Sequence, residues 1–229
     1  MPAPLVSSVD IIATHDRLLA SAGWPQVGAD ANNDVTDITD IWHWVHANHR
    51  FNSRLWAEED LARRTRVADA EIAANKRAID GFNQARNDAT ERMDELLLVA
   101  LGLVDAASAR SDVPVSCVPA GTRLNSETAG SIIDRMSIIA LKVHAMRAQT
   151  LREDVDGDHR AASAVKLGRL LQQRGDLGDC LDALLADAAA GRAFFKVYRQ
   201  FKMYNDPRFN PVLVDEGRAA GESPRPEPR

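Results

Sequence analysis

The sequence predicts an all-α protein, a helical bundle of about six to seven helices, and three observations support this fold class. Aromatic residues make up only 5% of the 229 residues. Valine and isoleucine rarely alternate with polar residues, as they would in half-buried strands. Strong helix formers dominate the composition, and apolar residues recur at helical spacing over a long central stretch, at Ile72, Ile79, Phe82, Met93, Leu96 and Leu97.

The N-terminal half is expected to contain two short helices and one long one. The first should run from about residue 7 to 22, because Ser7 or Ser8 can cap its start and Gly23 can end it. The second should cover about 36–50. Since no proline follows until the middle of the chain, we expect one long central helix over about 53–103, or two collinear helices broken near Gly81.

The C-terminal half is expected to contain four more helices after a connection rich in Ser, Ala, Pro and Gly over 105–125. Their expected ranges are about 126–152, 159–174, 177–190 and 192–202, with a tight break at Gly175-Asp176. We expect a single all-helical domain over residues 1–211. The proline-rich remainder, 212–229, should be a disordered tail, because it has too few apolar residues to offset the entropy of ordering.

Composition excludes several classes of protein. The formal net charge of -5 argues against a nucleic-acid binder that depends on bulk electrostatics. No apolar run approaches the roughly 20 residues of a membrane-spanning helix, and the N-terminus lacks the pattern of a signal peptide. Two cysteines cannot form a disulfide framework, so a cytoplasmic location is expected. We find no phosphate-binding loop, dinucleotide fingerprint or zinc motif, and we predict neither a cofactor nor a metal site.

The central stretch carries an unusual polar face. Lys76, Asp80, Asn83 and Asn87 follow one another at helical spacing beside the apolar stripe, and Arg86 lies on the stripe itself. One interpretation is a hydrated outer face. The other is that these groups point inward, since asparagine is a poor helix former with directional hydrogen bonds.

The segment 126–142 shows the same anomaly. It is mostly apolar around its circumference, yet Glu127, Asp134, Arg135 and Lys142 are embedded in it. Buried charges must be paired, so these residues form either an internal salt bridge or a pocket for a charged ligand. In a pocket, Lys76, Arg86, Arg135 and Lys142 would hold an anion. The carboxylates of Asp80, Asp134 and Glu127 would bind hydroxyls or act as general base, which makes them the candidate catalytic residues.

The segment 46–63 contributes further candidates. Trp56 is either a core residue or a stacking platform, and Glu59 and Arg63 follow one and two turns later. His43, His46 and His49 recur every third residue, but no second cluster completes a metal site. The aromatic and basic stretch 194–211 either covers a pocket or forms a helix with its own aromatic core. The full set of expected ligand-binding residues is Trp56, Glu59, Arg63, Lys76, Asp80, Asn83, Arg86, Asn87, Glu127, Asp134, Arg135 and Lys142.

Four ordered motifs resemble the bacterial family designated domain of unknown function 4254. They are Asn-x-x-Leu-Trp-x-x-Glu-Asp-x-Ala-Arg at 52–63, Lys-Arg-x-Ile-Asp-x-x-Asn-Gln-x-Arg-Asn-Asp at 76–88, Ser-Glu-Thr-x-Gly-Ser-Ile-Ile-Asp-Arg-Met-Ser-Ile at 126–138, and Lys-Met-Tyr-Asn-Asp-Pro at 202–207. Met136 stands where the family pattern has leucine, and the resemblance covers most of residues 7–211. It implies a helical, cytoplasmic protein associated with glycosyltransferase gene neighbourhoods and envelope-glycan metabolism, but it implies no activity and no catalytic residue.

Two functional hypotheses follow, and the sequence leaves open whether the protein is an enzyme. In the first, a polar pocket between helices binds an anionic small molecule, a phosphorylated or nucleotide-linked sugar. In the second, the protein is a non-catalytic scaffold or homodimeric partner of glycosyltransferases, whose buried polar network fixes helix register. Unpaired donors around an open pocket would favour the first, and a network paired only with itself would favour the second. Enzymes of the chorismate-mutase type and helical nucleotide pyrophosphatases are weaker alternatives.

Overall fold

The computed structural model describes residues 6–26, 40–200 and 208–219, and it confirms the all-α class. Its elements are α1 (Ser8–Ala20), α2 (Ile41–Leu61), α3 (Asp69–Ala100), β1 (Arg123–Leu124), α4 (Ala129–Thr150), α5 (Gly157–Ala189), β2 (Ala193–Phe194) and α6 (Pro211–Ala219). The chain divides into a first unit that ends at Val197 and a second unit that begins at Tyr198 and contains α6.

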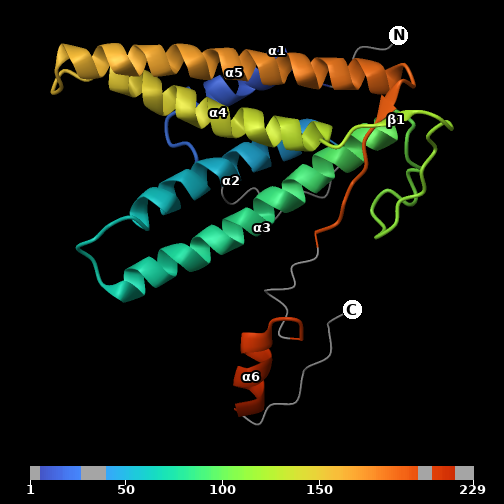
Figure 1. The fold of residues 1–229 in the computed structure, drawn as a ribbon, viewed down its shortest axis with the longest axis horizontal. Helices are drawn as coiled ribbons and strands as arrows, with labels where there is room; N and C mark the ends of the chain where they lie inside the picture. The colour runs from blue at the N-terminus through green and yellow to red at the C-terminus, as the bar shows by residue number, and fades with distance from the viewer. Residues whose placement is uncertain (1–5, 27–39, 201–207, 220–229) are drawn as a thin grey trace. The chain divides into compact units, whose positions relative to one another are not determined.

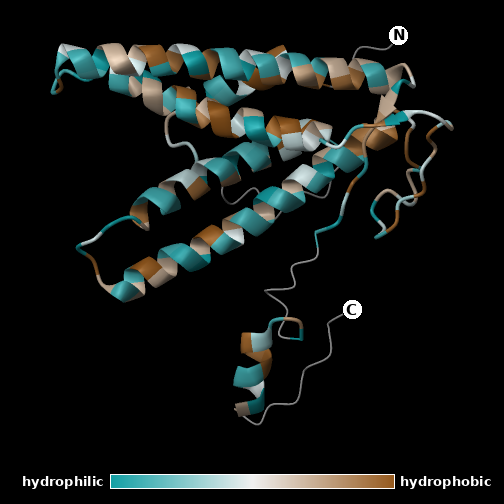
Figure 2. Cartoon of the chain, in the orientation of Figure 1, coloured by the Kyte–Doolittle hydropathy of each residue, from teal (hydrophilic) through white to brown (hydrophobic). Residues whose placement is uncertain are grey.

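The first unit is built from two helical hairpins and α1. Helices α2 and α3 pack along each other, as do α4 and α5, and α4 also contacts α1, α2 and α3 (Figure 1). The core that joins these helices is apolar, with Ile11, Val45, Met93, Ile133 and Leu181 all buried. Burying each such side chain contributes about 1.5–3 kcal/mol. Hydrophilic residues nevertheless interrupt the apolar colour along α2 and α3 (Figure 2).

The prediction of one long central helix over 53–103 is wrong. The chain turns back at residues 62–68, so α2 and α3 form a hairpin, and Gly81 lies inside α3 without a break. Arg64 holds the turn: its Nε donates to the Leu61 carbonyl at 2.9 Å, its Nη2 donates to Asn75 at 3.1 Å, and its Nη1 lies 3.5 Å from Glu71. This turn contains neither glycine nor proline, the residues that usually mark a helix break, so the sequence does not indicate it.

The break expected at Gly175-Asp176 is also wrong, because α5 continues through it. Arg174 pairs with Asp16 of α1 at 2.7 Å. One turn later, a Cβ on Gly178 would lie 3.0 Å from the Ser8 Cβ. The glycine at 178 therefore permits close approach of α1 and α5, and tertiary contact outweighs the weak helix propensity of this segment.

Three further boundaries differ from expectation. The helix expected over 192–202 is absent from its described part, which ends at residue 200: Ala193–Phe194 pair in parallel with Arg123–Leu124 instead. The tail expected to be disordered from 212 is helical up to Ala219 in α6, and residues 220–229 lie outside the described chain. The helix expected over 36–50 begins at Ile41 and continues to Leu61, because its residues pack against α3, and positions 36–39 lie outside the described residues.

Two helix starts follow the capping logic. Ser7 Oγ accepts a hydrogen bond from Asp10 N at 3.2 Å and starts α1, as expected. For α4, which was expected to start at about residue 126, the cap is Thr128: its Oγ1 accepts a hydrogen bond from Ser131 N at 3.1 Å. In the described residues, no helix is both long and apolar enough to cross a membrane.

Candidate functional site

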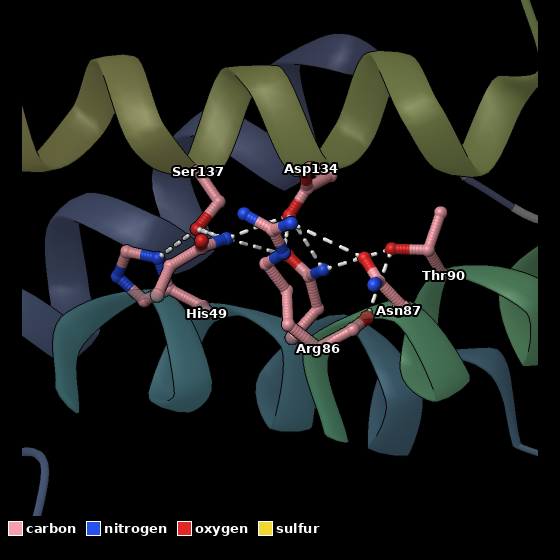
Figure 3. Close-up of polar contacts among 8 residues, drawn as sticks. His49, Arg86, Asn87, Thr90, Asp134 and Ser137 are labelled. Atoms are coloured by element: carbon pink, nitrogen blue, oxygen red, sulfur yellow. Dashed lines mark hydrogen bonds and ion pairs between the residues drawn. The ribbon is translucent and has the colours of Figure 1, made fainter. Parts of the chain in front are cut away.

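A network of polar side chains is buried where α2, α3 and α4 meet, with Asp134 at its centre. Asp134 Oδ1 accepts hydrogen bonds from Asn48 Nδ2 and Asn52 Nδ2, both at 2.8 Å. Asn52 also donates to Ser137 Oγ at 3.0 Å, and Asn48 donates to Thr90 Oγ1 at 3.2 Å. These residues, together with His49, Arg86 and Asn87, are called the Asp134 network below (Figure 3).

Helical spacing explains how each element presents its members. Asn48 and Asn52 stand one turn apart on α2, as Arg86 and Thr90 do on α3, while Asp134 and Ser137 stand three residues apart on α4. Figure 3 shows Ser137 and Asp134 extending from α4 toward His49 of α2 and toward Arg86, Asn87 and Thr90 of α3. The three polar faces therefore meet inside the bundle.

Arg86 supplies the guanidinium of the Asp134 network, and this group is incompletely bonded. Its Nε is buried without a hydrogen-bond partner, because the nearest Asp134 oxygen lies 4.0 Å away. Its Nη2 donates to Asn87 Oδ1 at 3.2 Å. The side chain of Arg86 is 25% exposed and that of Asp134 is 17% exposed. A guanidinium in this position has donors left for an anion.

A groove of about 320 Å³, called the first groove, opens beside Arg86. Its lining comes from α2, α3 and α4 and consists of Asn52, Leu55, Trp56, Glu59, Asp60, Arg63, Asn83, Arg86, Ile138 and Leu141. It combines an exposed indole, two guanidinium groups, two amides and two carboxylates over an aliphatic wall. Such a set can bind a molecule that carries both a negative group and hydroxyls.

Comparison with known families identifies the chain. Residues 42–197, more than half of its length, match the family described as "Protein of unknown function (DUF4254)". The chain belongs to this family. The DUF4254 match begins within α2 and ends at Val197, where the first unit ends, so it includes every residue of the Asp134 network and the first groove. No curated protein and no solved structure matched the chain.

The DUF4254 fold brings together part of the expected ligand-binding set. Trp56, Glu59, Arg63, Asn83 and Arg86 line the first groove, and Asp134 and Asn87 contact Arg86. Arg63 lies 3.1 Å from Glu59 on the exposed rim.

The remaining candidates lie elsewhere. The inward orientation expected of Lys76 and Asp80 is wrong: their side chains are 66% and 58% exposed, and they pair with each other at 3.0 Å. Glu127 and Arg135 also form an exposed pair, at 2.5 Å, and Lys142 lines a different groove. The polar residues of α3 keep the same helical spacing beyond the part of the helix that packs against α4. Spacing alone therefore could not distinguish the solvent-exposed part of α3 from the buried part.

Sequence reasoning missed Asn48, Asn52, Thr90 and Ser137. The first two carried a usable pattern, because two asparagines one turn apart weaken a helix unless their amides are bonded. Thr90 and Ser137 carried none, since a hydroxyl is common on any helix face. Among the described residues, no cluster of three or more His, Cys, Asp or Glu side chains is arranged to hold a metal ion.

His49 connects the network to a stack of three rings. Its Nδ1 lies 2.8 Å from Ser137 Oγ, and its ring stacks on His15 of α1 with centroids 4.3 Å apart and on Trp24 at 5.4 Å. Neither ring nitrogen of the buried His15 has a hydrogen-bond partner. Desolvation is the main cause that lowers the pKa of His15 well below 6.5 and that of His49 to about 3.

Replacing His15 with phenylalanine should therefore flatten the acid side of the stability profile. The folded pKa of His15 is lowered, so its contribution to stability is present above pH 6.5 and is lost as the pH falls, when only the unfolded chain takes up the proton. Between pH 7.5 and 5, wild type should lose about 2 kcal/mol relative to His15→Phe, measured by urea unfolding at each pH. An unchanged difference between the two proteins would contradict this.

Asp94 provides a control of opposite sign. Its Oδ1 accepts from Gly130 N at 2.6 Å in the first turn of α4, but complete burial prevails and raises its pKa to about 7. Because the folded pKa is raised, this stabilising contribution is present below about pH 4 and is lost as the pH rises to about 7. Wild type should therefore gain stability relative to Asp94→Asn as the pH falls from 7 to 5.

Proposed function

We propose that the first groove binds a phosphorylated or nucleotide-linked sugar of envelope-glycan metabolism. The observation that carries the proposal is the partly buried Arg86, whose Nε has no hydrogen-bond partner, beside a groove that Arg63 and Trp56 also line. Guanidinium groups suit the paired oxygens of a phosphate. The Trp56 indole is 37% exposed and offers an apolar face to a sugar ring or a base.

The polar groups around these cations match the rest of such a ligand. The Asn83 amide can donate hydrogen bonds to sugar hydroxyls or accept them, and the carboxylates of Glu59 and Asp60 can accept hydrogen bonds from those hydroxyls. The proposal is one of binding. Among the carboxylates considered as general base, only Asp134 lies next to a cation of the groove, and it already accepts two amide hydrogens.

Calorimetry and thermal unfolding with defined probes test this proposal. Glucose 1-phosphate and UDP-glucose should raise the melting temperature of the full chain, whereas glucose should not; a ligand at 100 times its Kd stabilises a protein by about 2.7 kcal/mol. Arg63→Gln and Trp56→Ala should each weaken binding about tenfold, equivalent to the loss of one charge-assisted or stacking contact. Both residues are exposed, so the variants should fold.

Arg135→Gln is the matched control. It removes an exposed guanidinium that pairs with a carboxylate and lies outside the first groove. Arg135 was also among the ligand-binding residues expected from the sequence. It should leave the affinity unchanged. If neither probe binds, or if Arg135→Gln weakens binding as much as Arg63→Gln, the proposal fails.

We propose as second candidate that the protein is a non-catalytic accessory protein or a homodimeric partner of glycosyltransferases, and one observation favours it. Asn48, Asn52, Thr90 and Ser137 bond to one another or to Asp134, which suits a network that fixes helix register. Sedimentation equilibrium of the chain alone, and mixed with a glycosyltransferase from the same host, tests this role. A strict monomer that does not associate with the enzyme would exclude it.

A further inference from the structure

Trp56 also lines a second groove, of about 420 Å³. Its floor and walls come from α2, α4 and α5. The lining residues are Trp56, Lys142, Ala145, Met146, Gln149, Lys166, Arg169, Leu170 and Gln173. Trp56 is the one residue that this groove shares with the first groove.

Charge is segregated around the second groove. The chain carries a net charge of -5, yet no Asp or Glu occurs in residues 135–152 or 159–175, the stretches of α4 and α5 that line it. Arg174, in the second of these stretches, has a carboxylate partner in Asp16. By contrast, Lys142, Lys166 and Arg169 form no ion pair within the described part of the chain.

The surface between these cations is apolar. Ala145 and Met146 of α4, Leu170 of α5 and the Trp56 indole of α2 all line the groove. The lysine and arginine stems add methylene groups while their charged ends remain in water. The groove therefore presents aliphatic surface bordered by cations, with no lining carboxylate to neutralise them.

We propose that the second groove binds a single-chain amphiphile with an anionic head group. The aliphatic chain lies against Met146, Leu170 and Trp56, and the head group pairs with Lys166 and Arg169. A groove of this volume falls within the roughly 300–1,000 Å³ of small-molecule sites. This site shares Trp56 with the proposed sugar site but depends on different charged residues.

Charge argues against two other occupants. A second copy of this chain, docked about a two-fold axis, would oppose the cations of the groove with the same cations. The exposed cations are hydrated by themselves, but they can form charge-assisted hydrogen bonds with a negative head group that a neutral hydrocarbon cannot form.

Isothermal titration of the full chain with dodecyl phosphate, below its micelle-forming concentration, tests the proposal. Dodecyl phosphate should bind at one site. Dodecanol, which lacks the phosphate, and inorganic phosphate, which lacks the alkyl chain, should each bind at least about tenfold more weakly. The double variant Lys166→Gln, Arg169→Gln should weaken dodecyl phosphate at least about tenfold. Both side chains are exposed, so the variant should retain the fold, which circular dichroism verifies.

The matched control is Arg77→Gln, Arg110→Gln, which removes the same charge from exposed positions outside the groove. It should bind dodecyl phosphate like wild type, and so should Arg63→Gln, which tests the sugar site independently. Equal affinity for dodecanol, or equal weakening by the control variant, would overturn the proposal. So would an absence of binding by dodecyl phosphate, including the case in which phosphatidylglycerol vesicles or an acidic amphipathic peptide bind instead.

Discussion

Replacing Gly130 with alanine should lower the free energy of unfolding by about 3 kcal/mol or more, because overpacking combines with disruption of the buried hydrogen bond from Gly130 N to Asp94. A Cβ at this position would lie 2.6 Å from the Thr90 carbonyl oxygen and 2.8 Å from Asp94 Oδ1. The first of these atoms belongs to the backbone of α3 and cannot rotate away. Urea unfolding at pH 7 measures the effect.

Gly81→Ala is the matched control for this prediction. Gly81 lies inside α3, is exposed, and has no neighbouring atom within 4 Å of the place that a Cβ would occupy. Alanine there should stabilise the protein by about 0.5–1 kcal/mol through helix propensity. If both substitutions changed the stability by similar amounts, α3 and α4 would not approach each other as closely as the structure shows.

Replacing Asp134 with alanine should cost about 2–4 kcal/mol, because it leaves the Asn48 and Asn52 amides without their acceptor and Arg86 without its counter-charge. Asp134→Asn should cost less, since it keeps an acceptor oxygen at the same place. The measurement is again the free energy of unfolding from urea titration.

Asp80→Ala is the control for Asp134→Ala, because it removes an exposed carboxylate instead of one inside the Asp134 network. The sequence assigns Asp80 and Asp134 the same role, but Asp80 forms only a surface pair with Lys76. Exposed pairs contribute about 0–1 kcal/mol, so this variant should remain close to wild type. A large loss for Asp80→Ala together with a small loss for Asp134→Ala would refute the described burial of the network.

The inward orientation of Asp134, which interrupts an otherwise apolar helix, agrees with the structure, whereas the same expectation for Lys76 and Asp80, which were simply periodic, does not. Asp134 lies in a segment that is apolar around most of its circumference, so burial followed from its neighbours. Lys76 and Asp80 shared a face with Asn83 and Asn87, but only the second pair lies near α4. Which turns of a helix are covered depends on where its partner ends, and that information lies elsewhere in the chain.

Composition and apolar spacing by themselves determined the all-α class, the starts of α1 and α4 to within a few residues, and the presence of polar groups that need partners. Tertiary structure alone decided where the chain turns: Arg64 forms the α2–α3 turn through bonds to residues on both sides, and α5 remains continuous through Gly175 because α1 packs against it. The physical reason is that local propensity amounts to about 1 kcal/mol per residue or less. Contacts between distant segments contribute several times more, so they choose among the helices that the sequence permits.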